Sequence, residues 1–279
     1  MKECTQLGAE FMGDNSVDAD AEMLSMIVDC LQAAGLKEFQ ISVGHASIFK
    51  GLADAAGFSA DETDELRSLL SNKNFFGVEE FVNGRNLPEN LKRCFGILRC
   101  MYTSADELAQ FMEDAREYET VYGALQRLEE LQELLLLYGI DRYVSFELGM
   151  VSDYHYYSGI LLSGYTYGTG EPIVKGGRYD ELLPMFGKNA AAIGFVVVID
   201  QLLEAIRRQQ IEVPIMHHTQ LLVYDASHRE EAVVAARKLR STGGRAELLL
   251  FDFAKGEAAY EAYAKENQIA RITWMLDGR

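Results

Sequence analysis

A long block of helical periodicity separates two stretches that are typical of β-strands. Between residues 49 and about 139, glycine and β-branched residues become scarce and apolar residues recur at helical spacing. Strand character is found before the block, in Phe39–Ile48, and after it, in Tyr143–Met150. The chain is therefore expected to contain a sheet whose strands are separated by an inserted helical subdomain. Within the block, helices are predicted over residues 61–70, 87–102, 105–118 and 120–138.

The segments around this block predict an antiparallel sheet packed with helices, which is an α+β fold. Apolar and polar residues alternate near the start of the chain, and two aromatic, β-branched runs flank a Gly- and Pro-containing turn in the manner of a β-hairpin. The strands are predicted over residues 1–13, 154–167, 173–179 and 191–198, and the helices over residues 17–34, 180–186 and 199–209.

The last sixty residues predict a separate small α/β domain. A linker begins at Glu212-Val213-Pro214, and strands and helices then alternate in the order typical of a parallel sheet. No G-x-G-x-x-G motif follows the first of these strands, so a dinucleotide site is not expected. The predicted division is a core formed by residues 1–48 and 140–210, a helical insertion over 49–139, and an α/β domain over 219–279.

Composition excludes several classes of function. The net charge is −17, from 43 acidic and 26 basic residues, and no block of basic residues is present, so strong binding to nucleic acid is disfavoured. No apolar run approaches the roughly 20 residues of a membrane span, and the first residues do not form a secretory signal. The four cysteines include no C-x-x-C pair, so free thiols are expected rather than disulfides or a zinc site. These features predict a cytoplasmic protein without a membrane segment or metal.

Residues 151–202 contain the densest set of candidate ligand-binding side chains. Tyr156 and Tyr157 could line a pocket or pack within a sheet, and spacing does not decide between these roles. His155 could act as a general base or a metal ligand, but no second ligand stands at metal-binding spacing, which favours an ordinary sheet histidine. Arg178, after paired glycines, could bind a carboxylate or phosphate, or form a structural ion pair with Asp180.

The first predicted strand offers a second candidate group. Gln6 and Glu10 share one face of that strand, where they could present an amide and a carboxylate to a ligand. The alternative is a sheet face that is simply open to water. A strand over residues 4–12 needs neighbours, and we expect the sequence to be N-terminally truncated on this ground.

These residues resemble the histidyl-tRNA synthetases, which are class II aminoacyl-tRNA synthetases. Gly177-Arg178-Tyr179-Asp180, followed by Gly194-Phe195 and a helix, resembles their third signature, and Val151–Gly159 resembles their histidine-binding motif. Thr5–Glu10 resembles the segment whose Gln and Glu hold the α-amino group of histidine. The resemblance covers nearly the whole chain. It implies a class II synthetase-like antiparallel sheet, the helical insertion, and an anticodon-binding-like C-terminal domain.

The departures from this pattern affect the residues that handle ATP. The resemblance puts Ser152 where the family has an arginine that activates histidine, and Gln201 where it has an arginine that clamps ATP. Asp153-Tyr154-His155 replaces Gly-Leu-Asp, while Tyr156 and Tyr157 match. Each lost donor to the developing negative charge removes about 3 kcal/mol of transition-state stabilisation. An active synthetase is therefore disfavoured.

A synthetase-like chain without these arginines resembles the regulatory subunit of ATP phosphoribosyltransferase. This family is catalytically silent, uses no cofactor, and is required by a short catalytic subunit in the first step of histidine biosynthesis. It also takes part in feedback inhibition by histidine. The resemblance implies a histidine-like pocket at Gln6, Glu10, Tyr156 and Tyr157, near Arg178, and self-association of a full-length chain through the first signature. The alternatives are a divergent enzyme that still activates histidine with ATP and a free-standing amino-acid sensor.

Overall fold

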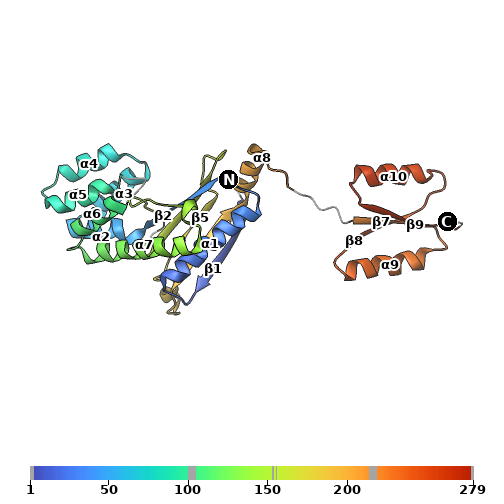
Figure 1. The fold of residues 1–279 in the computed structure, drawn as a ribbon, viewed down its shortest axis with the longest axis horizontal. Coiled ribbons are helices and arrows are strands. Elements are labelled where there is room, and N and C mark those ends of the chain that lie inside the picture. Colours follow the sequence, from blue (N-terminus) through green and yellow to red (C-terminus); the bar gives the residue numbers. More distant parts are fainter. Residues whose placement is uncertain (1–2, 100–104, 153, 155, 214–218, 278–279) are drawn as a thin grey trace. The chain divides into compact units, whose positions relative to one another are not determined.

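The computed structural model describes residues 3–99, 105–152, 154, 156–213 and 219–277. The chain forms two compact units, which divide between Glu212 and Val213 (Figure 1). The helical block and the sheet that flanks it both belong to the first unit. The predicted C-terminal domain falls in the second unit.

The first unit is built on a sheet of six strands within the described residues, in the order β1-β6-β5-β4-β2-β3. Neighbouring strands are antiparallel except β2 and β3, which run parallel. This sheet, together with the helices around it, confirms the predicted α+β class. The strands are β1 (Gln6–Met12), β2 (Phe39–His45), β3 (Val144–Phe146), β4 (Ile160–Thr166), β5 (Val174–Arg178) and β6 (Ala192–Val198).

The two faces of this sheet differ in cover. One face carries the apolar side chains of the strands and packs into a continuous core with helices α1 (Val17–Ala33), α7 (Glu119–Tyr138) and α8 (Ile199–Arg208). Because side chains alternate along a strand, the strand residues in between point to the opposite face. Many of the side chains there are small or polar, although Leu161, Val196 and Val198 share this face: Gln6, Gly8 and Glu10 on β1, Gly194 on β6, Lys175 and Gly177 on β5, and Ser163 on β4. We call this second side the open face.

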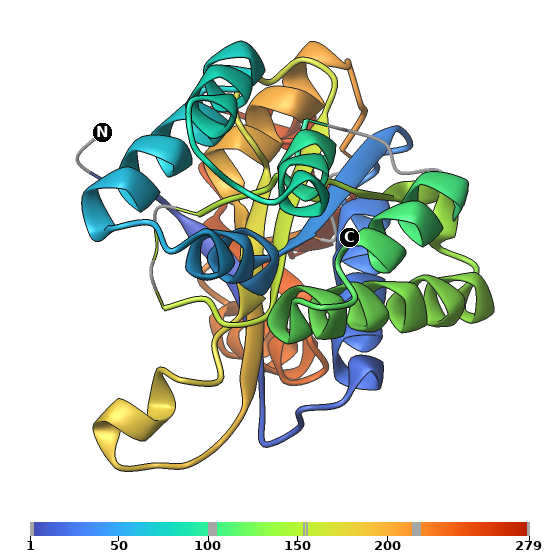
Figure 2. The same cartoon turned by 90° about the vertical axis from the view of Figure 1, so that its left-hand side faces the viewer.

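The helical block lies between β2 and β3 in the sequence and gathers beside the sheet (Figures 1 and 2). The longest of its helices, α7, buries its predicted leucine stripe: Val121, Leu125, Leu128, Leu131 and Leu135 are each at most 2% exposed. This stripe belongs to the same core as the sheet. The other helices are α2 (Ala46–Ala56), α3 (Ala60–Ser71), α4 (Phe75–Asn83), α5 (Glu89–Ile97) and α6 (Ala105–Asp114).

Three of the predicted elements were wrong, and side-chain caps explain two of the errors. Helix α2 begins at Ala46, inside the predicted strand 39–48, because the His45 ring accepts a hydrogen bond from the Ser47 amide and caps the helix. Helix α4 was missed; Asn74 caps it by accepting a bond from the Gly77 amide. The helix predicted over 180–186 is only a 3₁₀ turn, Leu183–Phe186, and another 3₁₀ turn covers Asp141–Tyr143.

The second unit confirms the predicted parallel α/β arrangement. Its strands β7 (Thr219–Tyr224), β8 (Arg245–Leu250) and β9 (Arg271–Met275) form a parallel sheet in the order β8-β7-β9. Helices α9 (Arg229–Ser241) and α10 (Glu257–Glu266) lie on opposite faces of this sheet (Figure 1). Buried Leu221, Val223 and Tyr260 form the core on the α10 side.

Candidate ligand-binding site

Three segments bring candidate side chains to the open face of the large sheet. Strand β1 carries Glu10, the connection from β5 to β6 carries Tyr179, and the segment before β4 carries Tyr156 and Tyr157. The Tyr179 hydroxyl donates a short hydrogen bond to the Glu10 carboxylate, and the Tyr179 ring stands edge-on to Tyr156 at 6.0 Å between centroids. Residues far apart in the sequence therefore form one group.

Glycines make room for this group. Glu10 lies opposite Gly194 in the β1–β6 register, and a Cβ on Gly194 would overlap the Glu10 carboxylate. Gly177 plays the same part for Tyr157, since a Cβ there would lie 2.8 Å from carbons of the tyrosine ring. Both glycines are needed for close approach of side chains over the sheet.

The tyrosines pack against one another, and Tyr154 and Tyr157 also border a cavity, so Tyr157 has both of the roles that the sequence left open. Ring centroids of Tyr156 and Tyr157 are 4.6 Å apart, and those of Tyr154 and Tyr156 are 5.5 Å apart. Burial, followed by a hydrogen bond with Tyr156, raises the pKa of Tyr157 well above its ordinary value. Burial and the bond to Glu10 raise the pKa of Tyr179 in the same way. Both hydroxyls therefore keep their protons at neutral pH.

The prediction that Tyr154–Gly159 is part of a strand was wrong, because β4 begins at Ile160. The Ser152 hydroxyl accepts a hydrogen bond from the Tyr154 amide at 3.0 Å, which turns the chain before the strand. The expected alternation of Tyr154 and Tyr156 against Tyr157 therefore does not apply. Asp153 and His155 lie outside the described residues.

The structure separates Gln6 from the other pocket residues. Gln6 shares the open face with Glu10, but it stands at the start of β1 opposite Val198, whereas Glu10 lies near the other end opposite Gly194. Its side chain is exposed, and its amide contacts the Cys4 thiol at 3.9 Å. A small ligand can therefore contact both Glu10 and Tyr156 without touching Gln6.

Arg178 does not reach the open face, which corrects its assignment to the pocket. It follows Gly177 on β5 and so points to the covered face, where its side chain is 1% exposed. Its guanidinium binds the buried carboxylate of Asp20, 2.7 Å away, and also Asp180. Of the two roles that the sequence left open for Arg178, the structure shows the structural ion pair. Arg178 forms it with Asp180 and also with Asp20.

Ser152 and Gln201 supply no positive charge. Ser152 borders a cavity of about 260 Å³ together with Tyr154 and Tyr157, while Gln201 lies half-buried in the first turn of α8. Helices α2 and α3 form the opposite wall of this cavity. Among the residues that the structure describes, the charged side chains around it are Lys50, Arg67, Asp54 and Glu181, two of each sign. A neutral or zwitterionic ligand fits this balance better than a polyphosphate.

Spacing along the sequence missed the roles of Tyr179 and Gly194. Both residues lie in the segments that resemble the third signature, but the resemblance assigned no role to either of them. The alternation of side chains along each strand could have identified them only together with the register of the strands. In the register of β1, β6 and β5, Glu10, Gly194 and Gly177 lie on the same face. That register is a property of the folded sheet.

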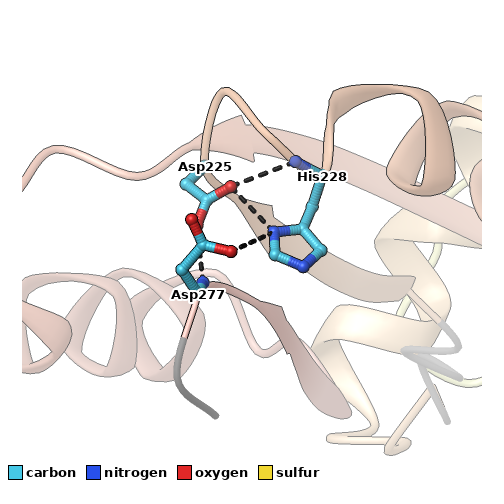
Figure 3. A group of neighbouring side chains, drawn as sticks. All are labelled: Asp225, His228 and Asp277. Carbon is cyan, nitrogen blue, oxygen red and sulfur yellow. Dashed lines mark hydrogen bonds and ion pairs between the residues drawn. The ribbon is translucent and has the colours of Figure 1, made fainter.

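A second polar cluster lies at the ends of β7 and β9 (Figure 3). Asp225, His228 and Asp277 place potential metal-binding atoms within 4.8 Å of one another. However, Asp225 Oδ1 accepts bonds from the amides of Ser227 and His228, the Ser227 hydroxyl and His228 Nδ1, while Oδ2 accepts from the Asp277 amide. These bonds lower the pKa of Asp225 and raise that of His228. The cluster joins two strand ends to the start of α9, and we assign no metal to it.

The comparisons with known proteins agree with this architecture. The sequence model of the family described as histidyl-tRNA synthetase matches residues 1–202. The chain belongs to this histidyl-tRNA synthetase-like family.

Among the described residues, no helix combines the length and apolar character needed for a membrane crossing.

Curated members of the family carry a more specific name. The chain is 38% identical over 242 residues to an ATP phosphoribosyltransferase regulatory subunit of Acetivibrio thermocellus, and this match covers 87% of the chain and 58% of the relative. It is 34% identical to the subunit of the same name from Ruminiclostridium cellulolyticum, covering 99% of the chain and 65% of that relative. The chain thus spans about three fifths of the length of these family members.

Solved structures of the family share the fold. A crystal structure titled as an ATP phosphoribosyltransferase regulatory subunit/histidyl-tRNA synthetase from Bacillus halodurans matches with a TM-score of 0.76 and 30% identity, over 98% of this chain and 69% of that one. The histidyl-tRNA synthetase of Nostoc matches with the same TM-score at 18% identity, over 95% of this chain and 65% of that one. The class II synthetase-like fold expected from the resemblance is therefore confirmed.

Proposed function

We propose that the chain is a non-catalytic regulatory subunit of ATP phosphoribosyltransferase. It would be required by a short catalytic subunit in the first step of histidine biosynthesis, in the cytoplasm, and would mediate feedback control by histidine. The observation that carries the proposal is that Ser152 beside the cavity and Gln201 in the first turn of α8 are neutral, where the family resemblance expects arginines that handle ATP. The names of the curated relatives support it.

The chemistry of the site favours binding over adenylate formation. Adenylate formation places growing negative charge on phosphate oxygens, and a preorganised donor to such charge contributes about 3 kcal/mol. A serine hydroxyl and a glutamine amide lack the charge of the two guanidinium groups that would be needed. This argues against the divergent synthetase that activates histidine with ATP.

Histidine is the ligand that we propose for the group around Glu10. A carboxylate within reach of solvent can bind an α-ammonium group, and the hydroxyls of Tyr156 and Tyr157 can donate to or accept from an imidazole. The rings offer flat apolar surface to the same ligand. This arrangement involves no cofactor. Nucleic acid is not a proposed partner, since the net charge is −17.

Reconstitution tests the proposal. The purified chain is mixed with a short-form catalytic subunit, and condensation of ATP with phosphoribosyl pyrophosphate is measured with each protein alone and with both. We expect a complex and activity only with both. Absence of a complex and of activation would contradict the proposal. Self-association of a full-length relative is measured alongside by sedimentation.

Two further assays separate the alternatives. Histidine-dependent exchange between ATP and pyrophosphate, catalysed by the chain alone, would indicate the divergent synthetase instead. Calorimetry with histidine, in the absence of a partner, measures the pocket itself. Binding of histidine without any effect on a catalytic subunit would indicate the free-standing sensor.

A further inference from the structure

Asp20 on α1 is a fully buried carboxylate beneath the covered face of the sheet. Its side chain is 0% exposed, and each of its oxygens accepts from a different arginine. Oδ1 accepts from Arg178 Nε on β5, and Oδ2 accepts from Arg127 Nε on α7, both at 2.8 Å. A buried cation needs such a partner, because burial without one carries a large desolvation cost. Asp20 is thus the fully buried partner of Arg178, whose second anionic partner, Asp180, is 29% exposed.

Arg178 in turn binds three segments of the chain. Its guanidinium donates to the Asp14 carbonyl at 2.9 Å, to the Ser16 carbonyl at 3.3 Å and to Asp180 Oδ1 at 3.1 Å. Its own carbonyl accepts from the Ser158 amide at 2.9 Å. One side chain and its backbone therefore join the turn after β1, the segment before β4 and the connection from β5 to β6.

Each of these segments carries a side chain of the candidate pocket. Asp14 follows the end of β1, which bears Glu10; Ser158 follows Tyr157 directly; and Asp180 follows Tyr179 directly. The segments are also linked to one another. The Asp180 amide donates to Ser158 Oγ at 2.8 Å, and Asp180 Oδ1 accepts from the Ala192 amide at 2.9 Å, two residues before Gly194.

We propose that Asp20 is a positioning residue for the candidate ligand-binding group of Glu10, Tyr157 and Tyr179, acting through Arg178. The proposal rests on the proposed binding of histidine at that pocket. Without the Asp20 charge, the Arg178 guanidinium loses one of its two anionic partners, and its bonds to the turn after β1 and to Asp180 loosen together. The segment before β4 follows, because the Asp180 amide donates to Ser158 Oγ. The pocket groups lie on the opposite face of the sheet from Asp20, so this effect requires no contact between Asp20 and the ligand.

Arg127 extends the same arrangement to the helical block. Its guanidinium donates to the carbonyls of Asn15 and Ser16, both at 3.1 Å, in the turn that Arg178 also holds. The turn after β1 is therefore fixed from β5 and from α7 at once. Asp20 is the common acceptor for both arginines.

The test uses the full chain and the Asp20→Asn variant, which keeps an acceptor oxygen but removes the charge. Calorimetry with L-histidine measures the dissociation constant, and amide hydrogen exchange measures protection in residues 13–16, 156–159 and 179–192. We expect at least tenfold weaker binding and faster exchange in all three segments. The matched control is Asp114→Asn, because Asp114 is 8% exposed and pairs with Arg93 at 2.8 Å away from these segments.

A general loss of stability would act differently. It would lower the melting temperature of both variants and leave the affinity of the folded protein for histidine unchanged. That result for Asp20→Asn, or unchanged exchange in the three segments, would overturn the proposal. If Asp20→Asn fails to fold, Arg178→Lys decides, because a lysine keeps a cation beside Asp20 but cannot bind the turn after β1 and Asp180 together; the same loss of affinity is expected.

Failure of the proposed function gives a distinct result. If the unaltered chain does not bind histidine, the proposed ligand is wrong. The exchange measurement still tests the positioning role without a ligand. Unchanged protection in Asp20→Asn and in Arg178→Lys would then overturn that role separately.

Discussion

Glu10 and Gly194 lie directly opposite each other on adjacent antiparallel strands, and the carboxylate of Glu10 occupies the space that a side chain at Gly194 would need. The Tyr179 hydroxyl donates to the same carboxylate. Two features therefore fix Glu10 over the sheet: the space above Gly194, which has no side chain, and the hydrogen bond from Tyr179. Glu10 is nevertheless exposed to solvent.

Replacing Gly194 with alanine should displace Glu10. The added Cβ would overlap the carboxylate, so Glu10 must leave its position near Tyr179. We expect histidine binding, measured by calorimetry, to weaken at least tenfold, which corresponds to about 1.4 kcal/mol. The control is Gly123→Ala on α7, where a Cβ meets nothing within 4 Å. The control should stabilise the protein by up to about 1 kcal/mol and leave binding unchanged. Equal affinity in both variants would contradict this account of Gly194.

Removing the Tyr179 hydroxyl tests the second restraint on Glu10. Tyr179→Phe keeps the ring that stands edge-on to Tyr156 but removes the donor to the carboxylate. A hydrogen bond to a charged group contributes about 1.5–3 kcal/mol, much of which the freed carboxylate recovers from water. We expect a fivefold to tenfold loss of histidine affinity with an unchanged melting temperature. An unchanged dissociation constant would show that Glu10 is held without Tyr179.

His45 should make the first unit sensitive to mild acid. Burial, aided by the charges of Arg127 and Arg178, lowers the pKa of His45 from 6.5 to about 3. The unfolded chain takes up a proton near pH 6.5 while the folded chain does not. The free energy of unfolding is therefore unaffected above pH 6.5 and falls below it, by about 1.4 kcal/mol per pH unit.

Denaturation at pH 7 and pH 5 measures this effect. His45→Asn is the control, because asparagine can cap α2 but does not titrate. We expect the unaltered chain to lose about 2 kcal/mol more than His45→Asn between the two pH values. Parallel loss in the two proteins would show that His45 takes up its proton in the folded state.

The leucine stripe of α7 should carry much of the stability of the first unit. Leu131 is 0% exposed, whereas Leu137 on the same helix is 82% exposed. We expect Leu131→Ala to cost about 2–5 kcal/mol in the free energy of unfolding and Leu137→Ala to cost less than about 0.5 kcal/mol. Chemical denaturation of both variants checks this. Similar losses would mean that the exposed leucine is covered in solution.

Periodicity predicted the elements whose pattern is strong and local. The α7 stripe and the alternating C-terminal strands and helices are where the sequence placed them. The errors arose where one side chain decides a boundary. His45 starts α2 inside an apolar alternating run, and Ser152 turns the chain before Tyr154, and neither effect changes the hydrophobic pattern.

The candidate site was predictable in its members but not in its geometry. Motif resemblance selected Glu10, Tyr156 and Tyr157, which the structure brings together through Tyr179. It could not tell that Arg178 faces away from them, because that depends on which face of β5 follows Gly177 in the folded sheet. Asp20 could not be identified from the sequence, because its partners Arg127 and Arg178 lie 107 and 158 residues away along the chain.

A regulatory subunit of the proposed kind should activate a separate catalytic subunit and make it responsive to histidine. The most direct test adds increasing amounts of the chain to a fixed amount of a short-form catalytic subunit and follows condensation of ATP with phosphoribosyl pyrophosphate, with and without histidine. We predict that activity rises until the partners reach a fixed ratio and that histidine then lowers it. No activation at any ratio, together with histidine-dependent ATP–pyrophosphate exchange by the chain alone, would contradict the claim.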